Sequence, residues 1–311
     1  MLGSFDVKIE AAGIIALGEI TAPEDVTITA KGGLISDANW DEQNVFAQRL
    51  ILETTKPEKT ETDQRIGHEL DAIETNVRIL TATTKEGGIF ISELNELEKP
   101  TIKAGTRVAD PPDAGQEPIG DDNVVLTVGG DLELKLIEAV GNSVKVVSSS
   151  GHILREAGSP EIKAKSAELE AAKGIGCLEK EDDFWNPYTI DAIKGQVETL
   201  IVKVTSPHAG IFYDNQAETL TDLSVTSPDG AVDISLGSGG YFRFDGGLTG
   251  TGGLYARKTG SITSLAFENT RGDLRLGALL LNANAVATFV ASGDILQDPG
   301  AAIPSTRRRR P

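Results

Sequence analysis

The sequence has few of the residues on which small disulfide-bonded domains and metalloproteins depend: among 311 residues there is one cysteine, and aromatic residues make up 5% of the chain. Because Cys177 is alone, neither an intrachain disulfide nor a cysteine metal cluster can form. No run of about 18 apolar residues occurs, which excludes a membrane-spanning helix. The apolar residues, 39% of the chain, are mainly Leu, Ile, Val and Ala, so a core must be built from small aliphatic side chains.

Basic residues are also in short supply. The formal net charge is -18 and the sequence pI is about 4.6, which argues against a nucleic-acid partner because phosphate binding requires a basic surface. The one strongly basic feature is Arg307 to Arg310, within a tail at 301–311 that we interpret as solvated rather than as a binding patch. The opening MLGSFDVKIE has neither a basic n-region nor an apolar h-region, so we expect no export signal in it.

Short runs of β-branched and aliphatic residues recur along the chain, whereas stretches with helical periodicity are scarce. Typical runs are DVTITAKG at 25–32, NSVKVVSSSG at 142–151 and AVDISLGSGG at 231–240. Each run is closed by Gly, Asn, Asp or Ser, the residues that tolerate turn geometry. The sequence therefore predicts an all-β protein.

Longer blocks of sequence recur as well. NVFAQRLILETT at 44–55 matches EIKAKSAELEAA at 161–172, and the segment at 70–90 matches the segment at 190–212. An internal repeat of this kind indicates a structure built by stacking similar units. The second match aligns Val77 with Val197, Leu80 with Leu200, and Ile89-Phe90 with Ile211-Phe212.

The offset between the blocks, about 120 residues, divides into several coils of roughly 20 to 25 residues, the length in which a solenoid completes one turn of strands and corners. We therefore predict a right-handed parallel β-helix, or β-solenoid, with loop insertions. It forms a single elongated unit over residues 1–300. Its blocks cover roughly 25–98 and 142–225, and a third block starts near 284.

Three octapeptides are expected to form the corners of this solenoid: GGLISDAN at 32–39, GHILREAG at 151–158 and GDILQDPG at 293–300. Each begins with glycine, which adopts backbone conformations that other residues resist. Because each continues with aliphatic residues and then an acid, we interpret all three as the same corner of the stack. The residues assigned to it are Gly32, Asp37, Gly151, Glu156, Gly293 and Asp298.

Polar, proline-rich or acidic segments interrupt the regular pattern. The segments at 56–64, 106–122 and 177–189 are interpreted as loops that project from the solenoid body. Neither end of the chain shows an obvious polar cap, and an uncapped solenoid exposes an unpaired strand edge. We therefore expect self-association end to end, or stacking against neighbouring repeats of a longer chain.

The motifs DVTITAKGGLISDAN, VRILTATTKEGGIFISELNEL and NAVATFVASGDILQD resemble the internal repeats of filamentous-haemagglutinin-like giant bacterial exoproteins. The resemblance implies a right-handed parallel β-helix, often exported by two-partner secretion, that serves as a long adhesive or scaffolding fibre. It also implies an extracellular or cell-surface location, a role without catalysis, and host or cell-surface glycans or proteins as partners. The secretion domain of such proteins is not recognisable in this sequence.

The loop DDFWNPY at 182–188 is the best candidate for a functional surface, because aromatic rings beside carboxylates suit a sugar or a protein partner. The alternative is that the rings fold back over a solenoid edge as a small satellite core. The segment ANW at 38–40 is a thinner version of the same combination. The candidate binding residues are Asp182, Asp183, Phe184, Trp185 and Tyr188.

No catalytic residue and no cofactor are assigned. The three histidines, His68, His152 and His208, have neither the order of a Ser-His-Asp triad nor metal-ligand spacing, and His152 is interpreted as a variable surface corner. Acidic clusters such as EKEDD at 179–183 could supply oxygen ligands to calcium, but a solvated loop is the favoured interpretation.

An enzymatic alternative remains open, namely a polysaccharide lyase or hydrolase. Hydrolysis would need paired carboxylates at a set separation, and Asp182, Asp183 and Asp191 are candidate acids. An active site would be unique to one set of coils, whereas the corners of this chain repeat. The sequence therefore favours a structural and adhesive rod over an enzyme.

Overall fold

The computed structural model describes residues 6–55, 64–105, 123–156, 161–179, 189–217, 220–228, 230–236, 240–244, 251–257, 262–271, 273–279, 281 and 285–297. Within these ranges all regular structure is β-strand and no residue is helical, which confirms the all-β prediction. The strands are β1 (Val7–Ala11), β2 (Ile15–Leu17), β3 (Ile20–Thr21), β4 (Asp25–Ala30), β5 (Ile35–Asp37), β6 (Val45–Thr54), β7 (Ile73–Thr83), β8 (Ile89–Glu93), β9 (Leu97–Lys103), β10 (Val124–Val128), β11 (Leu132–Leu134), β12 (Leu136–Ser148), β13 (His152–Arg155), β14 (Ile162–Ala171), β15 (Gly174–Ile175), β16 (Cys177–Glu179), β17 (Thr189–Asp191), β18 (Ile193–Gln196), β19 (Thr199–Val204), β20 (Ile211–Asn215), β21 (Asp222–Ser227), β22 (Val232–Leu236), β23 (Gly240–Phe244), β24 (Thr251–Arg257), β25 (Ser264–Asn269), β26 (Asp273–Leu279), β27 (Val286–Ala291) and β28 (Ile295–Gln297).

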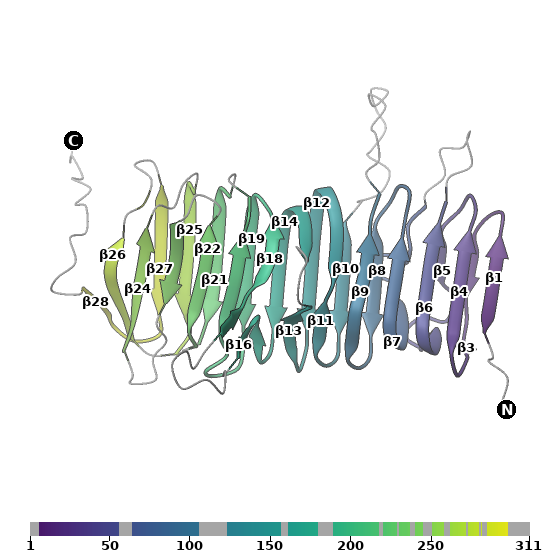
Figure 1. Ribbon diagram of the computed structural model, residues 1–311, viewed down its shortest axis with the longest axis horizontal. Helices are drawn as coiled ribbons and strands as arrows, with labels where there is room; N and C mark the ends of the chain where they lie inside the picture. The colour runs from purple at the N-terminus through teal and green to yellow at the C-terminus, as the bar shows by residue number, and fades with distance from the viewer. Residues whose placement is uncertain are drawn as a thin grey trace, which may run out of the picture.

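The strands stack in parallel, rung upon rung, along the long axis of the molecule (Figure 1). The strand pairings form three ladders, each a series of strands hydrogen-bonded one to the next along the axis. Ladder one links β1, β4, β6, β7 and β9 and continues through the first parts of β12 and β14 to β18. Ladder two links β2, β5, Ile66, β8, β10, β12, β14, β19, β21, β25 and β27. Ladder three links β9, β11, β13, β15, β20 and β22. The fold is the predicted parallel β-helix.

A column of aliphatic side chains fills the interior beside ladder two. Inward and outward positions alternate along a strand, as β4 shows with every second residue buried. Parallel pairing in register places like residues above one another on successive rungs, and burying each Leu, Ile or Val stabilises the fold by roughly 1.5–3 kcal/mol. The column consists of eleven residues: Ile15, Ile35, Ile66, Ile89, Val124, Val144, Ala167, Leu200, Leu223, Leu265 and Ala287.

The coil length agrees with the sequence estimate. Val124 pairs with Val144 on the next rung, a step of 20 residues, and Leu200 pairs with Leu223, a step of 23 residues. Four steps are longer, from Ile35 to Ile66, from Ile89 to Val124, from Ala167 to Leu200 and from Leu223 to Leu265. The expected insertions at 56–64, 106–122 and 177–189 fall within the first three of these steps. Loops are therefore added without changing the register of the strands on either side.

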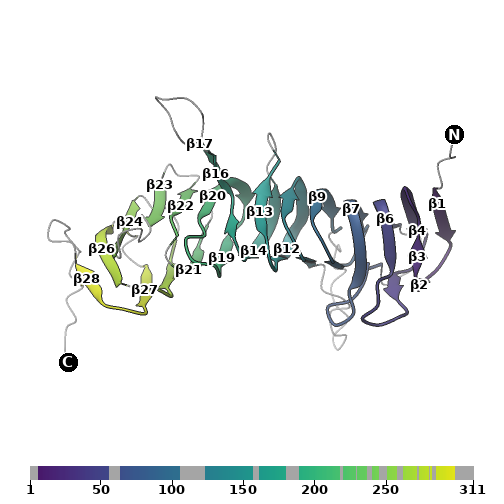
Figure 2. The same ribbon diagram turned by 90° about the horizontal axis from the view of Figure 1, so that it is seen from below.

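An antiparallel hairpin widens the helix near its C-terminal end (Figure 2). β23 pairs antiparallel with both β22 and β24, whereas ladder two passes directly from β21 to β25. Phe242 and Phe244 of β23 fill the enlarged interior, with their ring centroids 5.7 and 5.0 Å from that of Phe267. This aromatic cluster was not predicted from the sequence, because its three members lie outside the matched blocks.

The two sequence blocks share local structure but lie on different faces of the helix. Leu50 and Leu80 of the first block pair with each other in ladder one. Their counterparts in the second block, Ala167 and Leu200, pair with each other in ladder two. The aligned residues thus pair with each other in both blocks. The second block, however, lies on the neighbouring face of the helix, because its pair belongs to ladder two rather than to ladder one.

The three corner octapeptides consequently do not form one corner. Gly151 and Gly293 both follow ladder-two strands, β12 and β27, and lead into β13 and β28. Gly32 instead follows β4 of ladder one and leads into β5 of ladder two. The prediction of a single shared corner is therefore wrong for Gly32. A sequence repeat reports local turn geometry, and the number of turns between two copies decides the face on which each copy falls.

Candidate functional site

A shallow groove with a volume of about 740 Å³ runs along one edge of ladder two. Its lining comes from residues 47–48, 76–78, 94–98, 129–130 and 150. These five segments lie on consecutive rungs. Each one is connected by strand pairing or by backbone hydrogen bonds to the rung before it. Four spacings of about 4.8 Å give the groove a length of about 19 Å parallel to the rod.

The groove presents amide, guanidinium and carboxylate groups. The Nδ2 of Asn95 donates a hydrogen bond to the Oδ1 of Asn76 over 3.0 Å. The Nε of Arg78 lies 2.8 Å from the Oε1 of Glu98, and this hydrogen bond, with the charge of Glu98, raises the pKa of Arg78. The remaining exposed side chains of the lining include Gln48, Leu94, Glu96 and Ser150.

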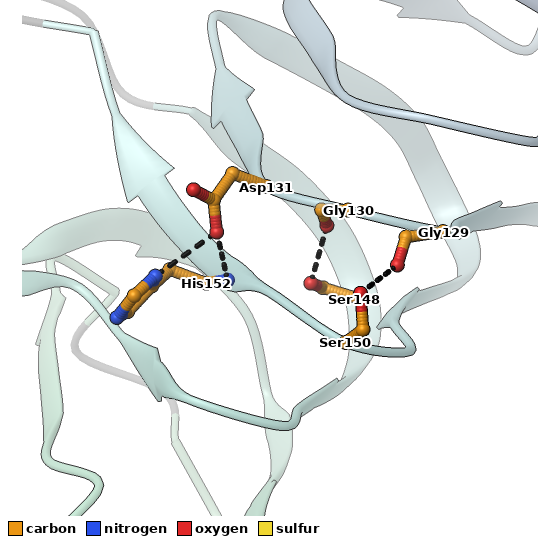
Figure 3. Close-up of polar contacts among 6 residues, drawn as sticks. All are labelled: Gly129, Gly130, Asp131, Ser148, Ser150 and His152. Atoms are coloured by element: carbon orange, nitrogen blue, oxygen red, sulfur yellow. Dashed lines mark hydrogen bonds and ion pairs between the residues drawn. The ribbon is translucent and has the colours of Figure 1, made fainter.

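The glycines at one end of the groove use their backbone groups within the fold (Figure 3). The Oγ of Ser148 donates to the carbonyl oxygen of Gly130 over 2.7 Å, and the Oγ of Ser150 donates to that of Gly129 over 2.5 Å. The amide nitrogens of both glycines donate to carbonyl oxygens of the preceding rung. The groove therefore offers a ligand side chains rather than unpaired backbone groups.

Glu93 lies beneath the groove and connects two of its walls. It is 2% exposed. Its Oε2 accepts hydrogen bonds from the Oγ1 of Thr75 over 2.7 Å and from the backbone nitrogen of Val77 over 2.9 Å, and its Oε1 accepts one from the backbone nitrogen of Asn95 over 3.1 Å. Burial raises the pKa of Glu93 to about 7, although these donors favour the ionised form. The position of two groove walls thus depends on one titratable side chain.

The second block keeps this buried link with a neutral side chain. Asn215 aligns with Glu93 and is 0% exposed. Its Oδ1 accepts a hydrogen bond from the backbone nitrogen of Val197 over 3.1 Å, and its Nδ2 donates to the carbonyl oxygen of Val197 over 3.2 Å. The same architecture is therefore held in one block by a carboxyl group and in the other by an amide.

A further pair of buried polar residues is also repeated. The Oδ1 of Asn44 accepts a hydrogen bond from the backbone nitrogen of Glu74 over 2.9 Å. Its counterpart Glu161 accepts one through Oε2 from the backbone nitrogen of Lys194 over 2.6 Å. Both acceptors thus bind the backbone nitrogen of the aligned residue on the next rung. The carboxylate of Glu161 is also paired with the Nε of Arg155 over 3.1 Å.

The side chains of the groove, by contrast, are not repeated. Arg78 aligns with Glu198, and Asn95 aligns with Ala217. The buried links that shape the corner recur in both blocks, whereas the exposed groups on it change in charge and size.

Trp40, in the ANW segment, is a strongly exposed aromatic residue on a turn. The side chain is 82% exposed, and the backbone φ is 62°, a conformation that bulky residues rarely adopt. Asp37 holds the turn, because its Oδ1 accepts hydrogen bonds from the backbone nitrogen of Asn39 over 2.9 Å and from the Nδ2 of Asn44 over 2.6 Å. The ring is therefore displayed on a hydrogen-bonded turn.

Carboxyl groups gather beside this turn. Burial, together with the charge of Asp37 and a hydrogen bond to it, raises the pKa of Asp71. Burial raises the pKa of Glu74 to about 7, and the charges of Asp37, Asp71 and Asp41 act in the same direction. Among the residues that the structure describes, no group of three or more His, Cys, Asp or Glu side chains is arranged to hold a metal ion.

His152 lies at a corner, as the first residue of β13 (Figure 3). Its Nδ1 is 3.0 Å from the Oδ1 of Asp131, and its backbone nitrogen donates to the same oxygen over 2.7 Å. Burial alone would raise the pKa of Asp131, but these hydrogen bonds lower it. The backbone nitrogen of Asp294 donates to the Oδ1 of Asp273 in the same way over 2.8 Å, so an aspartate joins two rungs at both corners.

The acidic residues assigned to the corners have different roles. Asp37 caps a turn, as described above, whereas the Oε1 of Glu156 forms an ion pair with the Nζ of Lys99 over 2.9 Å. The structure assigns β17 to the segment containing Asp191. The predicted binding residues and the last corner acid lie outside the described residues: Asp182, Asp183, Phe184, Trp185, Tyr188 and Asp298.

The groove was missed in the sequence because its lining is drawn from five segments between residues 47 and 150. The available signal was the change of residue type between the aligned blocks at exposed positions. Within the described ranges no helix is long and apolar enough to cross a membrane. Comparisons of the chain with protein families, with curated proteins and with solved structures find no match.

Proposed function

We propose that this chain is a structural and adhesive segment of a secreted or surface-exposed bacterial fibrous protein. The observation that supports this most is the uninterrupted column of eleven stacked residues along ladder two. Bending such a rod would separate backbone hydrogen bonds on one face, so the continuous ladders make it stiff. The resemblance of the repeats to filamentous-haemagglutinin-like exoproteins supports the extracellular location.

Stacking of copies end to end is part of this proposal. Among the described strands β27 pairs with β25 and with no strand beyond it, and Val286 and Val290 are 69% and 46% exposed. At the other end β1 pairs with β4 and with no other strand of the described ranges. Within the described part of the chain, each of these two strands therefore has one edge without a strand partner, and such an edge can be extended by another copy.

Negative-stain electron microscopy of the purified chain across a range of concentrations tests this role. We expect uniform rods at low concentration and end-to-end filaments at high concentration. Compact particles at every concentration would contradict the rod, whereas rods that never lengthen would contradict only the end-to-end stacking.

The second candidate function is a protein that binds or degrades polysaccharides, favoured by the polar groove and by the carboxyl groups of Glu96 and Glu98 in it. Degradation is tested by release of reducing ends from the polysaccharides named below. Release that is lost in Glu96→Gln would favour an enzyme. No release would leave binding as the task of the groove.

A further inference from the structure

We infer that the groove beside ladder two binds an extended, uncharged polysaccharide that runs parallel to the rod. This inference rests on the adhesive role proposed above and names the ligand class for it. The groove is open and extends about 19 Å along the rod, because it is built from five rungs spaced about 4.8 Å apart. A polymer chain fits this shape better than a compact small molecule, which favours enclosed pockets.

The hydrogen-bonding groups of the groove suit hydroxyl groups. Asn76 and Asn95 share one hydrogen bond, so the amide nitrogen of Asn76 and the amide oxygen of Asn95 lie outside that bond. Gln48 adds a third amide on the adjacent rung. Amides both donate and accept, and sugar hydroxyls do the same. A row of such groups can follow a sugar chain along the axis.

A peptide strand is a poorer ligand for this surface. Peptides add to a sheet through unpaired backbone groups at its edge. Here the amide nitrogens of Leu94, Gly129 and Gly130 donate to the preceding rung, and the carbonyl oxygens of the two glycines accept from serine hydroxyls. The backbone groups that would pair with a peptide are already used.

The charges of the groove disfavour an anionic polymer. The guanidinium of Arg78 is paired with Glu98, and Glu96 adds a negative charge that no basic residue of the described ranges pairs with. A polyanion would meet two carboxylates and one arginine already engaged, on a chain whose net charge is -18. Leu94, 52% exposed, offers an apolar surface for the carbon-bound hydrogens of a sugar ring.

Native gel electrophoresis of the full chain in gels that contain polysaccharide tests the inference. The neutral probes are mixed-linkage β-glucan, galactomannan and dextran, and polygalacturonate is the anionic probe. We expect at least one neutral polysaccharide to retard the chain and polygalacturonate to leave its mobility unchanged. Replacing both Asn76 and Asn95 by alanine should weaken the retarding interaction about tenfold, the effect of one or two lost hydrogen bonds.

Arg78→Ala and Arg243→Ala form a matched pair of variants, because each removes an exposed arginine that is paired with a carboxylate. Only Arg78 lines the groove, so only Arg78→Ala should change binding. The inference is overturned if no neutral polysaccharide retards the chain, if polygalacturonate retards it more strongly, or if the groove variants bind as the native chain does. Rods seen by electron microscopy in those cases would leave the structural role intact.

Discussion

Glu93 and Asn215 occupy the same position in the two repeated blocks, and each accepts a hydrogen bond from the backbone nitrogen of an aligned valine. The valine is Val77 in the first block, at 2.9 Å, and Val197 in the second, at 3.1 Å. Both acceptors are buried, yet only one can titrate. The first block is therefore sensitive to pH at a place where the second block is not.

Replacing Glu93 by glutamine should reduce the pH dependence of stability. The pKa of Glu93 is raised from 4.5 to about 7, so the folded state holds the proton more tightly than the unfolded state does. Its contribution is fully present below about pH 4.5 and is lost as the pH rises through about 7. The native chain should lose roughly 3 kcal/mol from this group across that window, and urea unfolding at several pH values measures this loss.

The control for that experiment is Glu53→Gln, which changes an exposed carboxyl group. It should leave the slope of the free energy of unfolding against pH unchanged. Glu74 has a pKa raised in the same direction, so Glu93→Gln should remove one part of the slope and Glu74→Gln another. A Glu93→Gln variant whose stability differs from that of the native chain by the same amount at every pH would contradict the assignment.

Gly195 and Tyr213 should prove strongly coupled. A Cβ atom at Gly195 would lie 1.7 Å from the hydroxyl of Tyr213. In the first block the aligned residues are Thr75, which is larger than glycine, and Ile91, which is smaller than tyrosine. Gly195→Thr alone should cost about 1–3 kcal/mol by overpacking. Tyr213→Ile should restore much of that loss when the two are combined, and a double-mutant cycle measures the coupling. Simple additivity would show that the two sites do not touch.

The hydroxyl of Tyr213 should contribute nothing favourable to stability. It is buried and has no hydrogen-bond partner among the described residues, and its burial raises the pKa of Tyr213. Removing an unsatisfied buried polar group is stabilising. Tyr213→Phe should therefore raise the free energy of unfolding by about 1 kcal/mol, and a decrease measured by chemical denaturation would reveal a partner for the hydroxyl.

Neighbouring residues of β19 should respond very differently to truncation. Leu200 is 0% exposed and belongs to the aliphatic column, whereas Ile201 is 40% exposed. Leu200→Ala should cost about 2–5 kcal/mol, because it removes buried methyl groups and leaves a cavity. Ile201→Ala, which removes a similar volume from the surface, should cost far less. Equal losses in thermal unfolding would mean that the register of this strand is wrong.

The sequence was sufficient to predict the strands, the coil length and the parallel stacking, because aliphatic alternation and glycine-bounded runs are local signals. It did not reveal which face each block occupies, since faces depend on the number of turns between blocks. The buried links were also hidden, because Asn44 aligns with Glu161 and Glu93 with Asn215, and such mismatches resemble surface variation. Only their shared hydrogen bonds identify them as equivalent.

Distances between spin labels along ladder two test the stacked rod most directly. Labels at the exposed positions Lys145 and Thr288 are five rungs apart, and labels at Ala16 and Thr288 are ten rungs apart. With about 4.8 Å per rung, pulsed electron paramagnetic resonance should give about 24 Å for the first pair and about 48 Å for the second. A second distance equal to or shorter than the first would contradict the parallel β-helix.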